Sequence, residues 1–370
     1  MKRVLIYGLK DPVGGVENLL LTYTSCFPKD EIVCDYLMFS CPFSKEEEIR
    51  KRGGTVWYLP SRIKRRRAYR REIRRIFEQN RYDAVWVNVA GLTNIDALKY
   101  AKRYGVPVRI VHSHGTRLYW TGRLMKYLVP LLHTLHKRGI HRVATHFWAC
   151  SKPAGEFMFP SRVWQRLRVI HNAVDTAVFC PDDARRADTR VALGLQDAVV
   201  VGHIARLCAE KNQDFLLDIF AEVYRKDPRA RLLLVGDGDL YAALVDKAQQ
   251  LGLTEAVIFT GFRTDVADLC RACDVFVLPS LAEGLGLSLI EAQACGVPCV
   301  ASDAVPAEAD VSGYVQFVGL DQPASVWGDT VLSLVNTTIP EPTAAVETAE
   351  YSLKQEAQKL VRFFTDKETV

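Results

Sequence analysis

Short apolar runs alternate with longer polar or amphipathic stretches along the chain, and this alternation predicts its fold. In the first half the runs fall at Arg3–Tyr7, Ile32–Phe39, Val56–Leu59, Ala84–Val89, Arg109–His112 and Phe147–Cys150. In the second half they recur at Val199–Ile204, Arg231–Val235, Val257–Gly261, Val275–Leu278 and Cys299–Ala301. Runs of this length suit buried parallel strands, and the helical patterns between them supply crossover connections. The sequence therefore predicts an α/β protein with parallel sheets and crossover helices, long enough for two domains.

One stretch of the second half, Asp274–Asp303, joins a strand, a glycine-rich loop, a helix and a further strand. The helix is predicted over Leu287–Ala294, directly after the loop EGLG. Free N–H groups and the dipole at such a helix start favour an anion, commonly a phosphate. Glu283 and Glu291 flank this position, and carboxylates accept hydrogen bonds from hydroxyls. The pattern favours a ligand that joins a diphosphate to hydroxyl-rich groups, with plain turn and capping chemistry as the alternative.

The spacing of these acids, E-x7-E within EGLGLSLIEAQACGVP, resembles the signature of retaining glycosyltransferases of the GT-B type, family 4. The segment GHIARLCAEKN resembles the family's G-R-x-x-x-x-K segment, with Arg206 and Lys211 as its two cations. HNAVD resembles the N-G-V-D segment that joins the two domains, although Ala173 replaces the usual glycine and puts the local backbone geometry in doubt. The resemblance implies an α/β protein of two Rossmann-like, doubly wound domains facing across a cleft. The amphipathic stretch Tyr351–Phe364 is then expected to be a C-terminal helix that crosses back to the first domain.

The resemblance also implies site residues. Those implied to bind the donor are Gly14, Gly15, Arg206, Lys211, Gly236, Phe262, Arg263, Glu283, Gly284, Gly286, Leu287, Ser288 and Glu291. In the family, Glu291 would hold the ribose and Glu283 would contact the transferred sugar. Arg206 and Lys211 would straddle the diphosphate, one by its planar fork and the other as a point charge. These two cations and Glu283, together with His114, form the implied catalytic set.

His112 ends a predicted strand and His114 follows it, at the sheet edge where doubly wound folds place ligands. One interpretation makes both of them structural. We expect His112 to point back into the sheet. The resemblance favours a position for His114 near the donor sugar.

Charge is distributed unevenly between the two halves. Residues 1–172 carry 32 Lys+Arg and 13 Asp+Glu, whereas residues 173–370 carry 16 and 30. Nine of the basic residues lie in Arg62–Arg75, RIKRRRAYRREIRR, which is predicted to be helical with Ile63 and Ile73 buried. We expect this segment to make peripheral contact with an anionic membrane, with a solvated helix face as the alternative. No nucleic-acid recognition motif accompanies it, so nucleic acid is not an expected partner.

The bulk composition is that of a globular protein, with 49% hydrophobic and 25% charged residues. No apolar run approaches the roughly 18 to 20 residues that span a bilayer. Ten scattered cysteines suit a reducing cytosol. We therefore expect a cytoplasmic protein, with peripheral contact at the inner face of the cell membrane.

Two segments of the sequence have spacings that resemble metal-binding motifs. Cys270-x2-Cys273 with Cys295-x3-Cys299 has zinc-like spacing, but these positions suit small core residues. Asp237-x-Asp239 matches the metal motif of the other large glycosyltransferase fold, GT-A, although the family's own V-G-x-G turn explains the glycines around it. We expect no metal and no cofactor other than the nucleotide-sugar substrate.

The predicted organisation has three parts: residues 1–175 as the acceptor-side domain, 176–345 as the donor domain and 346–370 as the returning helix. A polar linker is predicted from Pro181 to Asp188. The predicted function is metal-independent, retaining transfer of a hexose, from a UDP-sugar to a glycan or lipid-linked acceptor in synthesis of bacterial capsular or exopolysaccharide. The alternatives are a nucleotide-sugar epimerase or phosphorylase of the same fold, and a catalytically silent partner subunit.

Overall fold

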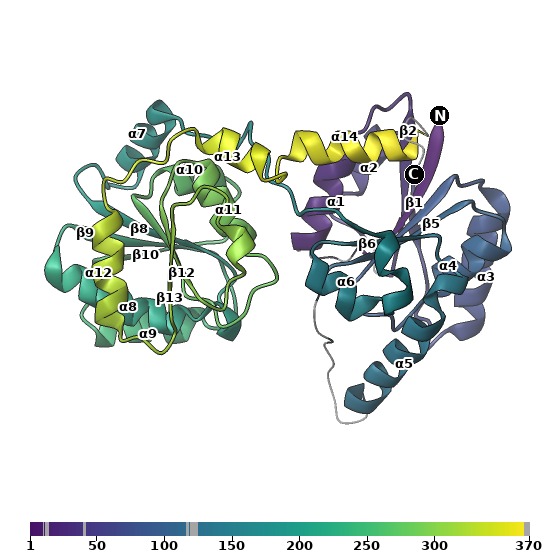
Figure 1. The fold of residues 1–370 in the computed structure, drawn as a ribbon, viewed down its shortest axis with the longest axis horizontal. Helices are drawn as coiled ribbons and strands as arrows, with labels where there is room; N and C mark the ends of the chain where they lie inside the picture. The colour runs from purple at the N-terminus through teal and green to yellow at the C-terminus, as the bar shows by residue number, and fades with distance from the viewer. Residues whose placement is uncertain (10, 12–14, 40–41, 116–117, 119–124, 366–370) are drawn as a thin grey trace. The chain divides into compact units, whose positions relative to one another are not determined.

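The computed structural model describes residues 1–370 except 10, 12–14, 40–41, 116–117, 119–124 and 366–370. The chain forms two compact units (Figure 1). The first comprises Met1–Asn172 together with the C-terminal segment from Lys354, and the second comprises Ala173–Leu353. Each unit is a parallel sheet covered by helices, as the alternating pattern predicts.

The first unit contains a seven-stranded parallel sheet in the order β3-β2-β1-β4-β5-β6-β7. Its strands are β1 (Lys2–Tyr7), β2 (Ile32–Met38), β3 (Val56–Tyr58), β4 (Ala84–Val89), β5 (Val108–Ser113), β6 (His146–Ala149) and β7 (Leu167–Val169). Its helices are α1 (Gly15–Ser25), α2 (Glu46–Lys51), α3 (Arg66–Gln79), α4 (Asp96–Arg103), α5 (Met125–Gly139), α6 (Lys152–Met158) and α14 (Leu353–Phe364), with 3-10 turns η1 (Ile140–Arg142) and η2 (Ser161–Arg166). The strand order reverses between β1 and β4, so their carboxyl ends form the topological switch point.

The second unit contains a six-stranded parallel sheet in the order β10-β9-β8-β11-β12-β13. Its strands are β8 (Val199–Ile204), β9 (Ala230–Val235), β10 (Val257–Gly261), β11 (Val275–Leu278), β12 (Cys299–Ser302) and β13 (Val315–Val318). Its helices are α7 (Asp183–Ala192), α8 (Gln213–Lys226), α9 (Tyr241–Gln250), α10 (Val266–Arg271), α11 (Leu287–Ala294), α12 (Ala324–Leu334) and α13 (Pro342–Thr348), with 3-10 turns η3 (Ala209–Lys211) and η4 (Ala307–Ala309). Here the switch point lies between β8 and β11.

Continuous apolar strands fill the centre of both sheets. All four residues of β11 and all four of β12 are buried, because helices cover both faces of a parallel sheet. In the first sheet Asp35 is a buried polar exception. Its carboxylate accepts hydrogen bonds from Arg3 Nε at 2.8 Å and from the Tyr82 hydroxyl at 2.9 Å, so the buried charge is compensated.

The last helix, α14, belongs to the first unit, where it appears in yellow among first-unit elements in Figure 1. Its aromatic end packs against the sheet, with the Phe363 ring 4.9 Å from Trp148 and the Phe364 ring 5.9 Å from Trp86. The chain thus returns to the first unit, as the GT-B resemblance implies. Ahead of the helix, Val174 and Ser352 form an isolated parallel bridge.

The predicted polar linker from Pro181 to Asp188 is wrong, because helix α7 begins within it. The Asp182 carboxylate caps this helix by accepting from the Arg185 N–H at 3.0 Å. Arg190 then forms an ion pair with Asp274 at 3.2 Å. No residue of α7 is fully buried, so the helix leaves no hydrophobic period in the sequence.

The basic segment Arg62–Arg75 is helical only from Arg66 onward. A turn precedes the helix, with the Arg65 N–H donating to the Ser61 carbonyl at 2.8 Å. Ile73 is fully buried as predicted, but the prediction for Ile63 is wrong, since it lies in the turn and is 89% exposed. Within the described part of the chain, the helices are too short or too polar to cross a membrane.

Candidate functional site

The predicted donor residues of the second unit gather at the carboxyl edge of its sheet. Arg206 follows β8, and Glu283 lies in the loop after the neighbouring strand β11. Gly236 follows β9, and its N–H donates to the Gly261 carbonyl at 3.0 Å. That bond joins the loops after β9 and β10, so Phe262 borders the same edge. The switch point of this sheet therefore brings together residues that lie far apart in sequence.

Lys211 and Glu283 form the central contact of this edge. The Lys211 ammonium lies 2.5 Å from the Glu283 carboxylate, and only 9% of the Glu283 side chain is exposed. The Ser280 hydroxyl donates to the same carboxylate at 2.7 Å. Both partners are partly desolvated, so removing either one would leave an uncompensated charge at this edge. The sequence analysis did not single out Ser280, although it lies only three residues before Glu283 in the same loop.

Helix α11 begins at this loop as predicted. Its N-cap residue, Gly286, adopts the left-handed conformation with φ of 84°. The first turn contains no acidic residue, so the N–H groups there are not paired with a local carboxylate. Leu287 and Glu291 are four residues apart and share one face of the helix. The structure thus presents the helix start and Glu291 on one side.

Glu291 lies in α11 in a partly buried position, and desolvation raises the pKa of its carboxyl group to about 7. Among the described side chains, none forms an ion pair or hydrogen bond with this carboxylate. A carboxyl group without a partner in an apolar setting favours its neutral form. Glu291 is therefore poised to exchange a proton near neutral pH, a property that the sequence pattern does not reveal.

Arg206 is largely exposed and lies 3.9 Å from the carboxylate of Asp239, which is 92% exposed. Asp237 instead accepts from the Gly238 N–H at 2.7 Å, as a turn residue does. Gly236 packs so closely against the Ala205 carbonyl that a Cβ atom there would approach its oxygen to 2.0 Å. The fold is not GT-A, so the alternative interpretation of Asp237 and Asp239 as that fold's metal motif is wrong.

Phe262 and Arg263 border the site edge as exposed residues. The Phe262 side chain is 79% exposed. Arg263 forms an ion pair with Asp265 at 2.5 Å, and that contact raises the pKa of its guanidinium. Gly284 is exposed, and Ser288 lies in the first turn of α11. These placements are compatible with ligand contact but do not by themselves assign it.

A buried histidine that the sequence analysis did not single out supports the loop of Arg206. The His203 Nδ1 atom donates to the Val277 carbonyl at 2.8 Å, and Gln213 Nε2 lies 3.2 Å from its other ring nitrogen. Gln213 also donates to the Arg206 carbonyl at 2.9 Å. Burial lowers the pKa of His203 to about 4, so the ring stays neutral. This chain of contacts fixes the backbone that carries Arg206.

The first unit has its own cavity at the switch point, of about 570 Å³. Gly15, at the start of α1, and His114, after β5, both line it. Gly14 lies outside the described residues. The cavity brings these residues together with Tyr7, Phe39 and Asn88, which the sequence analysis did not single out.

His112 and His114 pack against each other with ring centroids 4.0 Å apart. The Asn88 amide nitrogen faces the carbonyls of Tyr7 and Trp86, so its oxygen accepts from His114 Nε2 at 2.9 Å. Burial lowers the pKa of His114 to about 3, and burial together with the neighbouring ring lowers that of His112. Both rings are neutral near pH 7. His112 is fully buried, as expected of a structural histidine.

The four cysteines with zinc-like spacing are free and lie in the core of the second unit. The Cys273 thiol donates to the Leu269 carbonyl at 3.2 Å, and the Cys299 thiol to the Val297 carbonyl at 3.3 Å. Burial raises the pKa of the Cys273 and Cys299 thiols, which disfavours the thiolate that zinc requires. These contacts favour the interpretation as core residues.

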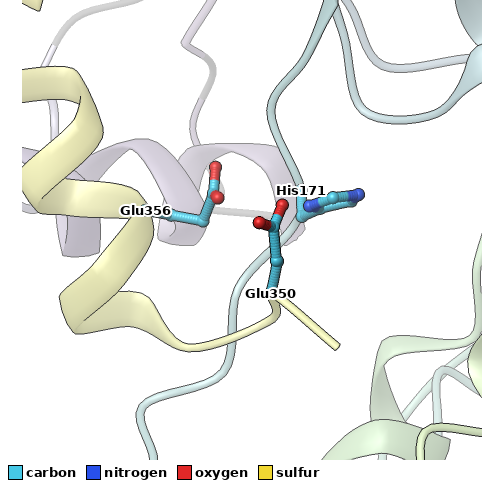
Figure 2. Close-up of side chains that lie close together, drawn as sticks. All are labelled: His171, Glu350 and Glu356. Atoms are coloured by element: carbon cyan, nitrogen blue, oxygen red, sulfur yellow. The ribbon is translucent and has the colours of Figure 1, made fainter. Parts of the chain in front are cut away.

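Figure 2 shows the side chains of His171, Glu350 and Glu356. His171 and Glu356 belong to the first unit, and one ligand atom of each lies within 4.8 Å of the other. Glu356 also forms an ion pair with Lys359 at 2.7 Å. Glu350 belongs to the second unit. Two groups alone do not complete a metal coordination sphere, so we assign no metal to the first unit here.

Two Rossmann-like units with a C-terminal helix returning to the first are the architecture of GT-B glycosyltransferases. Comparison with protein-family models matches residues 13–178 to "Glycosyltransferase Family 4" and residues 198–332 to "Glycosyl transferases group 1". The chain is 35% identical over 326 residues to the glycosyltransferase EpsF of Bacillus subtilis (strain 168), covering 86% of this chain and 84% of EpsF. It therefore belongs to the family 4 glycosyltransferases.

One further relative and one solved structure extend the comparison. A GDP-mannose-dependent alpha-(1-6)-phosphatidylinositol monomannoside mannosyltransferase of Mycolicibacterium smegmatis is 30% identical over 239 residues, covering 62% of this chain and 60% of that protein. Among solved structures, Anabaena Alr3699/HepE in complex with UDP superposes with a TM-score of 0.78 at 20% identity, covering 99% of this chain and all of HepE. At that identity the likeness shows the fold alone.

Proposed function

We propose that this glycosyltransferase moves a sugar from a UDP-sugar to a glycan or lipid-linked acceptor in synthesis of a bacterial surface polysaccharide. The observation that carries the proposal is the Lys211–Glu283 pair beside the start of α11, with Glu291 on the same side of that helix. The similarity to EpsF, which is named as a glycosyltransferase, supports the transfer reaction. HepE, which shares the fold, has been solved with UDP and with UDP-glucose, and this supports a uridine nucleotide donor.

In the proposed complex the diphosphate lies against the N–H groups at the start of α11. Arg206 and Lys211 would supply positive charge as the diphosphate leaves. Arg206 is exposed, and its backbone carbonyl is held by Gln213. Lys211 would then share its charge between the diphosphate and Glu283. Removing one such preorganised donor typically costs about 2.7 to 4 kcal/mol in the transition state. Glu291 would accept from the ribose hydroxyls, and Glu283 from hydroxyls of the sugar.

The proposed transfer retains the anomeric configuration. The bond between the anomeric carbon and the leaving phosphate oxygen breaks, and the acceptor oxygen bonds to that carbon on the same face. The acceptor proton passes to an oxygen of the departing diphosphate, so no protein base is required. His114 is neutral and donates to Asn88, which suits a positioning contact with the sugar better than proton abstraction. The family resemblance implies that Gly14 and Gly15 also contact the diphosphate.

The proposed reaction needs no metal ion, because Arg206, Lys211 and the helix start take the electrostatic role that a metal ion would have.

We further propose that the enzyme acts in the cytoplasm at the inner face of the cell membrane. Basic residues of the Arg62–Arg75 segment would attract an anionic leaflet, at about 1 kcal/mol for each residue near the surface. Flotation with anionic liposomes at low salt tests this contact, and absence of binding would argue against it.

The deciding experiment is calorimetric titration of the purified chain with UDP, GDP and ADP in EDTA, followed by transfer assays. Tight binding of UDP without metal, weakened by Glu291→Ala, is the expected result. Binding only after a divalent ion is restored would contradict the metal-free mechanism.

The anomeric configuration of the product, read by NMR, tests retention. Turnover of the donor without any acceptor would instead indicate an epimerase.

A further inference from the structure

Helices α3 and α4 of the first unit enclose a groove of about 780 Å³ that is lined almost entirely by cations (Figure 1 places the helices side by side). Seven arginines, one lysine and a single aspartate line it. Arg67, Arg70 and Arg74 reach it from α3, and Lys99 and Arg103 reach it from α4. We refer to this feature as the α3–α4 groove. Its formal charge is strongly positive, so it is suited to a multiply charged anion.

The groove charges are poorly neutralised within the described chain. Its aspartate, Asp96, forms an ion pair with Arg62 at 2.9 Å. Arg67, Arg70 and Arg74 recur at spacings of three and four residues, and like charges at that spacing destabilise a helix. Helix α3 has no acidic residue in its first turn to offset them. Folding requires only the buried face of this helix, so the cationic face is available for a ligand.

The groove adjoins the cavity that contains His114 and Gly15. Tyr69, which lines the groove, stacks on Phe39, which lines the cavity, with ring centroids 6.4 Å apart. Arg62 donates to the carbonyl of Thr93, a cavity residue, at 3.4 Å. A ligand with an anionic end and a sugar end can therefore occupy both features of the first unit.

We propose that the α3–α4 groove binds the phosphate groups of the acceptor, a sugar joined to a lipid carrier through a diphosphate, while the acceptor sugar enters the neighbouring cavity. The proposal rests on the proposed transferase function and names its acceptor class. Guanidinium forks match pairs of phosphate oxygens, and several of them converging in a concave groove suit a diphosphate. Ile63, in the turn before α3, is 89% exposed and offers an apolar contact to the first carbons of the lipid.

The test compares a groove variant with a charge-matched control in the full chain. The groove variant combines Arg67→Gln, Arg70→Gln and Arg74→Gln, which preserve helix propensity. The control combines Lys29→Gln, Arg81→Gln and Lys152→Gln, three exposed cations of the same unit outside the groove. Acceptors are a water-soluble sugar diphosphate with a short prenyl chain and the same sugar on a phosphate-free alkyl chain.

The expected result is a rise of about tenfold or more in KM for the diphosphate acceptor in the groove variant, corresponding to at least 1.4 kcal/mol of binding. Its kcat and its affinity for UDP should stay unchanged, and the control should match the wild type. The phosphate-free acceptor should be used poorly and equally by all three proteins. A KM within twofold of wild type in the groove variant overturns the proposal.

Binding of inorganic pyrophosphate, titrated with saturating UDP present, separates failure of the groove from failure of the transferase function. If no acceptor is glycosylated but the groove variant alone loses pyrophosphate affinity, the anion site stands and the proposed function fails. If the variant loses only binding to anionic vesicles, with pyrophosphate affinity and KM unchanged, the groove is a membrane-contact surface and the acceptor-phosphate proposal is wrong.

Discussion

At the scale of single residues, the most informative contact is the ion pair between Lys211 and Glu283. In the family pattern these residues have separate tasks, one toward the diphosphate and one toward the sugar. In the structure they neutralise each other, with Ser280 as a third partner. The ion pair holds both side chains at the sheet edge before a donor arrives, which lowers the entropy lost on binding.

Replacing Glu283 with Gln separates binding from catalysis. The substitution preserves shape but removes the negative charge that orients Lys211. We expect UDP to bind within a few-fold of wild type, or more tightly because Lys211 is released, while kcat for transfer falls about a hundredfold or more. Calorimetry and initial rates measure the two effects. Equal loss of UDP affinity and of kcat would contradict the assignment of Glu283 to the sugar.

Glu291 should make donor binding depend on pH. Desolvation raises its carboxyl pKa to about 7, and the carboxylate is the form suited to accept from two ribose hydroxyls. Affinity for a UDP-sugar should therefore weaken as pH falls below 7, approaching tenfold per pH unit. A UDP-sugar is the better probe, because the terminal phosphate of free UDP itself titrates in this range. Glu291→Gln should bind more weakly at pH 8 and show a flat profile between pH 6 and 8.

At the scale of elements, the start of α11 depends on one backbone conformation. Gly286 has φ of 84°, and an added Cβ would lie 3.2 Å from Val305 Cγ1. Gly286→Ala should therefore reduce the free energy of unfolding of the second unit by about 1 to 2 kcal/mol and misplace the first N–H groups of the helix. Denaturant titration measures the change in stability, and calorimetry with UDP measures the loss of affinity expected from the misplaced N–H groups.

Gly284→Ala is the matched control for that substitution. A Cβ atom at Gly284 meets no atom within 4 Å, and its φ lies outside the left-handed region. Stability should stay within about 0.5 kcal/mol of wild type, as at other exposed sites. If the two alanine variants were equally stable, the left-handed start of α11 would not be the constraint that we describe.

At the scale of the whole molecule, buried titratable groups are distributed differently between the two units. In the first unit, burial lowers the pKa of His112, His114, His133 and His146. In the second, the lowered pKa of His203, about 4, is accompanied by the raised pKa of Glu291, about 7. The units should therefore respond differently to acid.

Acidification should destabilise the first unit before the second. The unfolded chain binds protons at His112 and His114 near pH 6.5, whereas these two buried rings stay neutral in the folded first unit, so its stability falls below that pH by up to about 1.4 kcal/mol per pH unit for each of the two. In the second unit Glu291 acts oppositely, because its folded form takes up a proton between pH 7 and 4.5 and offsets His203. Hydrogen exchange at pH 7.5 and 5.5, read separately for each unit, checks this. Earlier loss of protection in the second unit would contradict it.

The sequence by itself determined most strands of the two sheets and most of the candidate residues at the carboxyl edge of the second sheet. Val199–Ile204, Val275–Leu278 and Leu287–Ala294 are predicted with the bounds that the structure shows, because buried parallel strands and a glycine-started helix leave strong local patterns. The short strands β7 and β13 went unpredicted, as did helix α7, which is held by the Arg190–Asp274 ion pair and not by a buried face. Patterns of apolar residues report burial, so elements with little burial leave little trace.

Only the tertiary structure decided which of the predicted residues touch and what state they hold. The Lys211–Glu283 pair spans 72 residues of sequence, and the support of Arg206 by His203 and Gln213 depends on the neighbouring strands β8 and β11. The neutral state of His114 follows from burial beside His112 and from the Asn88 contact. The basic segment was visible as a charge run, but its concave shape arises from packing of α3 against α4. Local sequence sets propensity and charge, whereas desolvation and contact partners exist only once distant segments pack together.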